Sequence, residues 1–321
     1  MSPRSVDWDR RIGRQLKLRD LHVLSTVLQL GSMAKAATQL SVTQPAVSQA
    51  IADLERAVGV RLVDRGPHGV APTVYGELLL KRGTEVFDAL KQGMQDIAFA
   101  SDPGSGEVRV GADMSYIAGG FMSAVIERVS QRHPRLSVQV VETTTTTAAP
   151  EFRELRDRQV DLMLGRLSHP IEADDLQIQV LFDEAIVVAA SANSRWADRR
   201  KIELKELVDE PWILAPPENR ARGLVEEAFR AQGLPPPRPR VTTFSMQLRM
   251  QLLASGRYLT VFTDSTVRYS ADRWSLRVLP VKLGQRLPVV AVTLRHRMPT
   301  PAVRLFIAEV QALTKTPRPR R

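Results

Sequence analysis

The stretch 18–73 constrains the fold more than any other part of the chain, because it encodes short helices joined by tight turns. Apolar residues recur at helical spacing between residues 18 and 30, which predicts a first helix. Gly31 is suited to end this helix, and Ser32 is suited to cap a second, alanine-rich helix that ends near Leu40. The alanines on the inner side of that helix let another helix approach closely.

The third expected helix, 43–55, has one apolar and one polar face. Thr43 is placed to cap it, and Pro45 falls in its first turn, where the missing N–H costs little. Its inward positions are Val47, Ala50, Ile51, Leu54 and Val58. Its outward positions, uncharged until Asp53, are Gln44, Pro45, Ser48, Gln49 and Ala52. Gln can bond an adenine edge at two points and Ser can reach a base or a phosphate, so we predict a helix-turn-helix unit with this recognition helix.

A compact segment that includes Arg65 and His68 follows the third helix and adds candidates for DNA contact. The predicted DNA-binding residues are Ser32, Thr43, Gln44, Pro45, Ser48, Gln49, Arg65 and His68. His68 is expected to be mostly neutral at pH 7, which weakens a phosphate contact there. Helix-turn-helix units also serve as protein docking modules, and that role is the alternative.

Residues 36–55 read AATQLSVTQPAVSQAIADLE and are followed by VGVRL at 58–62 and PTVYG at 72–76. This run resembles the N-terminal domain of LysR-type transcriptional regulators. The resemblance implies a winged helix-turn-helix domain at 16–74, a linker and dimerisation helix at 75–100, a hinge at 101–106 and an effector-binding domain at 107–316. Within the wing, Val63 stands where the family usually has Phe, and His68 stands where it often has Arg or Lys.

Residues 74–99 form a predicted long helix with a heptad-like apolar stripe. The stripe consists of Leu79, Val86, Leu90, Gly93 and Ile97. Such a stripe by itself is more often intramolecular core than coiled coil, but the resemblance implies that this helix dimerises. Two reading heads also recognise more base pairs than one. We therefore predict a homodimer, or the homotetramer that the family suggests, with Leu79, Val86, Leu90 and Ile97 at the contact.

Beyond the Gly- and Pro-containing linker 101–106, strand and helix patterns alternate as in an α/β domain with a parallel sheet. Strands are expected at 107–112, 136–141, 160–165, 176–181, 184–190, 212–215, 240–243, 258–262, 276–279 and 288–294. Helices are expected at 119–132, 151–158, 220–232, 245–255 and 301–313. This part resembles the type 2 periplasmic-binding-protein fold, which implies lobe I at 107–182 and 288–316 and lobe II at 183–287. The predicted fold class is therefore α/β overall, with an all-α winged helix-turn-helix and a long linker helix at the N-terminus.

In such folds ligands bind between the lobes, beyond the carboxyl ends of the strands. The predicted effector-binding residues, all in loops that follow strands, are Ser115, Thr143, Thr144, Arg166, Ser245 and Thr263. Free N–H groups near Ser115 would favour an anion, and Arg166 is a natural two-pronged partner for a carboxylate. The alternative for Arg166 is a salt bridge across the lobes, with Glu142 or Asp264. The threonines at 143–147 either surround a polar ligand or form a surface loop. A small organic acid is the favoured effector.

The composition excludes several other classes of protein. The 45 basic and 35 acidic side chains give a net charge of +10, which favours a polyanionic partner, although residues 1–73 contribute only +4. The chain has no cysteine, so disulfides, thiolate metal sites and cysteine catalysis are excluded. The five histidines show no metal-ligand spacing, and we predict no catalytic residue, metal site or cofactor. No signal peptide and no membrane span are expected, so a cytoplasmic protein is predicted.

The favoured function is sequence-specific transcriptional regulation, with double-stranded DNA, a small-molecule effector, a second copy of the chain and RNA polymerase as partners. One rival is a solute-binding or enzymatic α/β protein whose N-terminal helices only mediate assembly. A second rival is a nucleoid-like DNA binder without sequence preference. The uncharged recognition face disfavours both, because an assembly face should be more apolar and a nonspecific face more basic. The basic residues at 318–321 are interpreted as a solvated tail.

Overall fold

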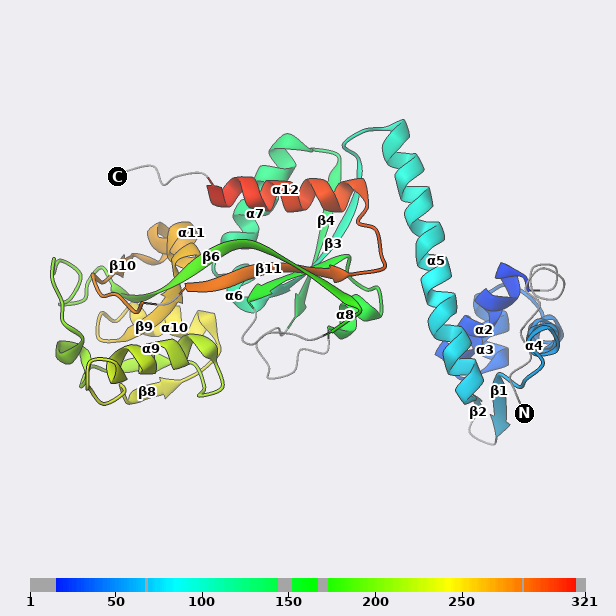
Figure 1. The fold of residues 1–321 in the computed structure, drawn as a ribbon, viewed down its shortest axis with the longest axis horizontal. Coiled ribbons are helices and arrows are strands. Elements are labelled where there is room, and N and C mark those ends of the chain that lie inside the picture. Colours follow the sequence, from blue (N-terminus) through cyan, green and yellow to red (C-terminus); the bar gives the residue numbers. More distant parts are fainter. Residues whose placement is uncertain (1–15, 67–68, 144–151, 167–172, 285, 316–321) are drawn as a thin grey trace. The chain divides into compact units, whose positions relative to one another are not determined.

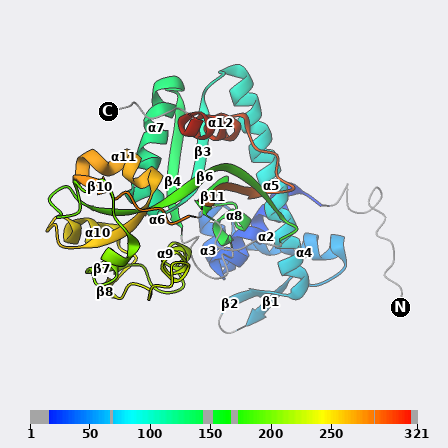
Figure 2. The same cartoon turned by 60° about the vertical axis from the view of Figure 1, so that its left-hand side comes forward.

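The computed structural model describes residues 16–66, 69–143, 152–166, 173–284 and 286–315. The chain divides into two compact units, 1–94 and 95–321, and the boundary falls within the long helix α5 (Val74–Ser101). Figure 1 shows the elements of both units, and Figure 2 shows the same fold after a rotation.

The first unit contains three short helices, a two-stranded wing and most of α5. The elements before α5 are α2 (Leu18–Leu30), α3 (Met33–Gln39), α4 (Gln44–Val58), β1 (Val63–Gly66) and β2 (Gly69–Pro72). The predicted helix ends are confirmed, since Gly31 at the end of α2 has a φ of 62° and the Ser32 hydroxyl accepts the N–H of Lys35. The Thr43 hydroxyl likewise accepts the N–H of Ala46 at the start of α4. These caps satisfy N–H groups that a helix start leaves without partners.

One core holds these three helices together. Its buried members on α2 and α4 include Leu24, Val27, Val47, Ile51 and Leu54. On α3, Ala36 and Ala37 are buried, as the alanine pattern predicts. At the end of α4, Ala57 is buried while Val58 is only partly buried. The buried face of the helix there is thus centred one residue earlier than predicted. The recognition helix is therefore fixed by packing along its inner face and leaves its outer face free.

The start of α5 is fixed against the segment before the wing. The Thr73 hydroxyl donates to the Arg61 carbonyl at 2.7 Å and accepts the N–H of Gly76 at 3.1 Å. A Cβ at Gly76 would lie 2.0 Å from the Leu62 carbonyl oxygen, so a glycine is required where the two backbones meet.

The second unit is an α/β structure built on a mixed sheet. Its strands are β3 (Gly106–Asp113), β4 (Leu136–Thr143), β5 (Leu162–Arg166), β6 (Leu176–Ser191), β7 (Trp212–Leu214), β8 (Pro239–Thr242), β9 (Leu259–Thr263), β10 (Leu276–Val278) and β11 (Arg286–Leu294). Their order is β4-β3-β5-β11-β6-β9-β7-β8, and β10 pairs with β6. Strands β3, β4 and β5 are parallel, whereas β11 is antiparallel to both β5 and β6.

The sheet carries two lobes that share the strands β6 and β11, which run across both in Figure 1. The helices of this unit are α6 (Met114–Ala118), α7 (Phe121–Arg132), α8 (Arg153–Arg156), α9 (Arg220–Arg230), α10 (Met246–Leu253), α11 (Asp264–Trp274) and α12 (Pro301–Lys315), with a 3₁₀ turn η2 (Leu204–Leu207). In lobe I, α12 packs against both α7 and β3. The three elements share a core that includes Val110, Val125 and Phe306. In lobe II, α9 packs on Trp212 in a separate core.

The described part of the chain contains no helix that is both long and apolar enough to cross a membrane.

Three predictions of secondary structure were wrong, and one predicted helix is confirmed with a later start. The strands expected at 176–181 and 184–190 are one continuous strand, β6. The helix expected at 119–132 starts only at Phe121, after the separate short helix α6 and the turn at Gly119 and Gly120. The helix expected at 151–158 is the single turn α8. Helix α11 was not predicted, because its many polar residues hide the few buried ones, among them Val267.

Candidate functional site

The recognition helix α4 presents the predicted polar face to solvent. Gln44, Pro45 and Gln49 are exposed, and Ser48 is half-buried. Arg65 on the wing donates from Nη2 to Ser48 Oγ at 3.3 Å, although the two residues are 17 positions apart. The tertiary fold thus brings two predicted DNA-binding residues together on one surface of the first unit.

Other residues of this face are held by local hydrogen bonds. The Gln49 amide donates to Asp53 Oδ1 at 2.8 Å, and the same oxygen pairs with Arg56 at 2.7 Å. Ser32 and Thr43 use their oxygens to accept helix N–H groups, which leaves their O–H groups able to donate to a phosphate. His68 lies outside the described residues.

The apolar stripe of α5 is mostly exposed. Val86, Leu90 and Ile97 are 42%, 50% and 62% exposed, respectively. Leu79 differs, because it packs against the core of the helix-turn-helix unit. Three large apolar side chains of the predicted stripe are therefore exposed on α5 and are not part of the core.

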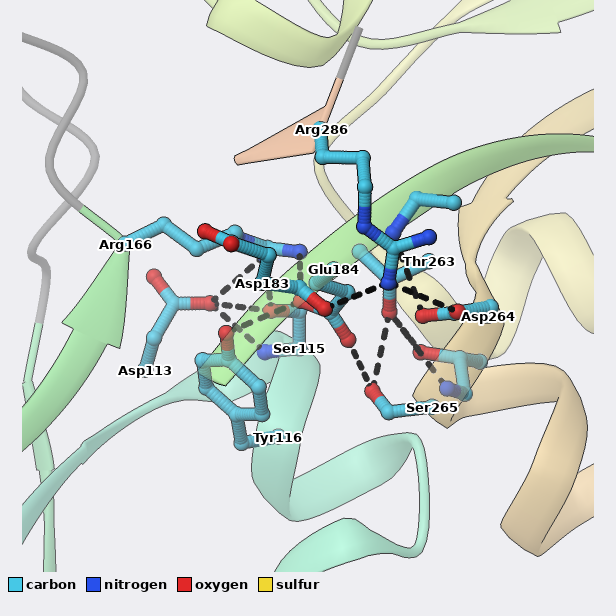
Figure 3. Close-up of polar contacts among 12 residues, drawn as sticks. Asp113, Ser115, Tyr116, Arg166, Asp183, Glu184, Thr263, Asp264, Ser265 and Arg286 are labelled. Carbon is cyan, nitrogen blue, oxygen red and sulfur yellow. Dashed lines mark hydrogen bonds and ion pairs between the residues drawn. The ribbon is translucent and has the colours of Figure 1, made fainter. Parts of the chain in front are cut away.

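In the second unit, Arg166 ends β5 and lies among polar side chains of β3, α6 and β6 (Figure 3). Its Nη2 donates to Ser115 Oγ at 2.5 Å, and its Nη1 donates to Glu184 Oε2 at 3.4 Å. Asp113 Oδ1 lies 3.9 Å from Nη2, and the guanidinium carbon lies 5.0 Å from the centre of the Tyr116 ring. The Arg166 side chain is only 15% exposed, so these contacts replace hydrogen bonds that the guanidinium would make to water.

Glu184 lies where β6 passes from lobe I to lobe II and is fully buried. Its Oε2 accepts from the Tyr116 hydroxyl at 3.0 Å as well as from Arg166, and its Oε1 accepts from the Ser265 hydroxyl of α11. One carboxylate therefore connects α6 and β5 of lobe I to α11 of lobe II (Figure 3).

The protonation states follow from burial and charge. Burial raises the pKa of Tyr116 well above its ordinary value, and the Glu184 carboxylate adds to this against the opposing charge of Arg166. Burial alone would lower the pKa of Arg166, but Tyr116, Glu184 and Asp113 together raise it. Burial and the charge of Glu184 raise the pKa of Asp264. At neutral pH the cluster therefore holds a neutral Tyr116 phenol and a charged Arg166 guanidinium.

Two expectations about this cluster were wrong. The N–H of Ser115 is not free for an anion, because Asp113 caps the short helix α6 and its Oδ1 accepts that N–H at 2.9 Å. Arg166 does form the salt bridge of the alternative hypothesis, but its partners are Glu184 and Asp113 and not Glu142 or Asp264. Asp264 instead faces Arg286 at 3.8 Å. The continuous strand β6 explains the difference, since it carries Glu184 into the space between the lobes.

The remaining predicted effector residues are dispersed. Thr143 ends β4 beside Asp113, and its buried Oγ1 meets no hydrogen-bond partner among the described residues. Thr263 is buried and caps α11. Ser245 is exposed and caps α10. Thr144 lies outside the described residues.

Sequence reasoning missed Tyr116, Glu184, Ser265 and Arg249, which all contribute to this region. Glu184 had a signal, since it is a carboxylate inside a run of apolar strand residues. Arg249 lies on α10 between the buried Met246 and Met250 and gave no signal. Within the described ranges no three His, Asp or Glu side chains are arranged to hold a metal ion.

Comparisons with known proteins agree with this architecture. Residues 18–77 match the family model described as bacterial regulatory helix-turn-helix protein, lysR family, and residues 101–315 match that of the LysR substrate binding domain. The transcriptional regulator GbpR of Azospirillum brasilense is 27% identical over 318 residues, covering 98% of this chain and 92% of GbpR. TdcA of Escherichia coli is 33% identical over 198 residues, 62% of either chain.

Solved structures show the same fold. A full-length OxyR variant from Pseudomonas aeruginosa has a TM-score of 0.64 at 22% identity, covering 93% of this chain and 95% of its own. Full-length CbnR in complex with its target DNA has a TM-score of 0.53 at 19% identity, covering 94% and 100%. With a LysR-type helix-turn-helix before a LysR-type effector domain, the chain belongs to the LysR family of DNA-binding transcriptional regulators, which are not enzymes.

Proposed function

We propose that this regulator reads its operator through the outer face of α4 as a homodimer, or as a homotetramer built from such dimers, and that it responds to a small organic acid bound between the lobes. Its partners are then operator DNA, the effector, further copies of the chain and RNA polymerase, in the cytoplasm. The observation that carries the effector class is the guanidinium of Arg166, which lies at a strand end between the lobes and donates to the hydroxyl of Ser115, another predicted effector-binding residue.

Gln44 is the residue we assign to base reading, because it is exposed at the start of α4. Replacing Gln44 with alanine should weaken binding to the cognate operator by about 1–3 kcal/mol and binding to random DNA much less. Fluorescence anisotropy at matched salt measures both affinities. The exposed Gln29 of α2 provides the control, since Gln29→Ala should leave both affinities unchanged. An equal loss on both DNAs would make Gln44 a phosphate contact.

The exposed stripe of α5 is the surface we assign to dimerisation. Leu90→Asp would place a charge in an apolar contact, so self-association and operator binding should weaken together. Sedimentation velocity and a binding titration report the two effects. Thr84→Asp is the control, because Thr84 is exposed two residues before Val86, on the opposite side of a helix with about 3.6 residues per turn. If Leu90→Asp stays associated at low concentration, the stripe has another role.

The effector proposal is tested at Arg166. Arg166→Lys keeps a charge but loses the planar fork, so effector affinity should fall by at least tenfold, about 1.4 kcal/mol. Basal operator binding should remain, since the reading head belongs to the other unit. The effector is first found by screening small carboxylates for a change in the operator footprint, and the variant is then titrated. A wild-type footprint that responds only to uncharged compounds would exclude an organic acid.

A further inference from the structure

Arg249 of α10 is a half-buried arginine whose charge has no counterion among the described residues. Its Nη1 donates to the Val261 carbonyl at 3.2 Å, and its guanidinium carbon lies 5.0 Å from the centre of the Phe262 ring. Its Nε is shielded from solvent and has no hydrogen-bond partner in the part of the chain that the structure describes. No ion pair joins Arg249 to a described carboxylate, whereas Arg166 has two.

These contacts leave one edge of the guanidinium without a hydrogen-bond partner among the described residues. Nη1 faces the backbone of β9 and holds the side chain in place. The N–H of Nε and the neighbouring N–H of Nη2 form the side edge of the group, and neither donates a hydrogen bond to another described residue. That edge carries two parallel donors, which is the arrangement that accepts both oxygens of a carboxylate.

The electrostatic surroundings support the same conclusion. Burial, followed by the positive charge of Arg166, lowers the pKa of Arg249 to about 10, against a weaker attraction from Asp113. Arg249 therefore remains charged at neutral pH but is destabilised in its site. A buried polar group without a hydrogen-bond partner lowers the stability of the folded state. Proteins keep such destabilising groups at sites where ligand binding needs them.

We propose that Arg249 is the anion-binding residue of lobe II, and that it receives the carboxylate of a small effector on its Nε–Nη2 edge. This inference rests on the proposed organic-acid function and adds to it a specific receptor on α10. Arg166, on lobe I, already forms ion pairs with Asp113 and Glu184. The charge that an incoming acid neutralises is therefore that of Arg249. A ligand held from α10 on one side and beside Arg166 on the other connects the two lobes.

The first test needs no ligand. In the full-length protein, Arg249→Met removes an uncompensated charge and keeps most of the side-chain volume, so the thermal midpoint should be unchanged or raised. Arg166→Met removes a charge that two carboxylates compensate, so its midpoint should fall by several degrees. A fall for Arg249→Met as large as that for Arg166→Met would overturn the proposal, because Arg249 would then be a structural residue.

The second test uses acetate, benzoate and succinate as probes, titrated against sodium chloride at equal ionic strength. At least one carboxylate should shift the Arg249 Nε–H resonance and raise the thermal midpoint of the wild type. Arg249→Met should abolish that rise, and Arg249→Lys should retain part of it. A rise that persists in Arg249→Met but disappears in Arg166→Lys refutes the role of Arg249 and leaves the organic-acid function standing. If no carboxylate shifts either the resonance or the midpoint, both proposals fail.

Discussion

Replacing Glu184 with glutamine should lower the free energy of unfolding of the second unit by about 3–5 kcal/mol, because it removes one partner of a buried ion pair. The carboxylate is fully buried and receives hydrogen bonds from Tyr116, Arg166 and Ser265. An amide keeps the shape but can accept on only one side, and Arg166 is left with Asp113 as its ionic partner. Because these contacts join the lobes, the variant should also bind an effector with altered affinity.

Denaturant unfolding followed by tryptophan fluorescence measures the effect, since Trp196, Trp212 and Trp274 all lie in the second unit. Glu226→Gln is the matched control, because Glu226 is 23% exposed and pairs with Arg222 and Arg230 within α9. Its loss should cost below about 1 kcal/mol. Equal effects of the two substitutions would mean that Glu184 does not hold the lobes together.

Replacing Asp161 with asparagine should have an effect of the same size, about 3–5 kcal/mol, on lobe I. Asp161 is 5% exposed in its side chain and lies 2.8 Å from both Arg109 Nη2 and Arg297 Nη2. Its Oδ2 also accepts the backbone N–H of Arg109 at 2.8 Å. The neutral amide would leave two largely buried guanidinium groups without this charge. Hydrogen exchange of the Arg109 amide reports the local loss, and Asp157→Asn, at a half-exposed pair with Arg153, should leave it unchanged.

The lowered pKa of Asp161 predicts how the free energy of unfolding depends on pH. Burial alone would raise the pKa of Asp161, but the hydrogen bonds from Arg109 and the charge of Arg297 outweigh it and hold the pKa below its ordinary value. A carboxyl with a lowered pKa in the folded state contributes stability above its unfolded pKa, about 3.9, and loses it as the pH falls through the folded value. The difference between wild type and Asp161→Asn should therefore be constant near neutral pH and shrink below about pH 4. A difference that grows on acidification would contradict this assignment.

The helix-turn-helix unit was predictable because its signals are local. Gly31, Ser32 and Thr43 act within four residues of their own positions, and the packing of α4 repeats at helical spacing. The α/β class of the second unit was predictable for the same reason. The break expected within β6 was wrong, because Asp183 and Glu184 interrupt the apolar pattern although the strand continues through them.

The sequence by itself therefore determined the reading head, the long helix and the α/β alternation, since each depends on neighbours within a few residues. Only the tertiary structure decided the chemistry between the lobes. Glu184 meets Tyr116 from 68 positions away and Ser265 from 81 positions away, and no spacing along the chain encodes these contacts. The environments of two arginines also depend on the tertiary structure. Arg166 pairs with two carboxylates, whereas Arg249 pairs with none among the described residues. The sequence around each arginine does not distinguish them, because these partners come from distant parts of the chain.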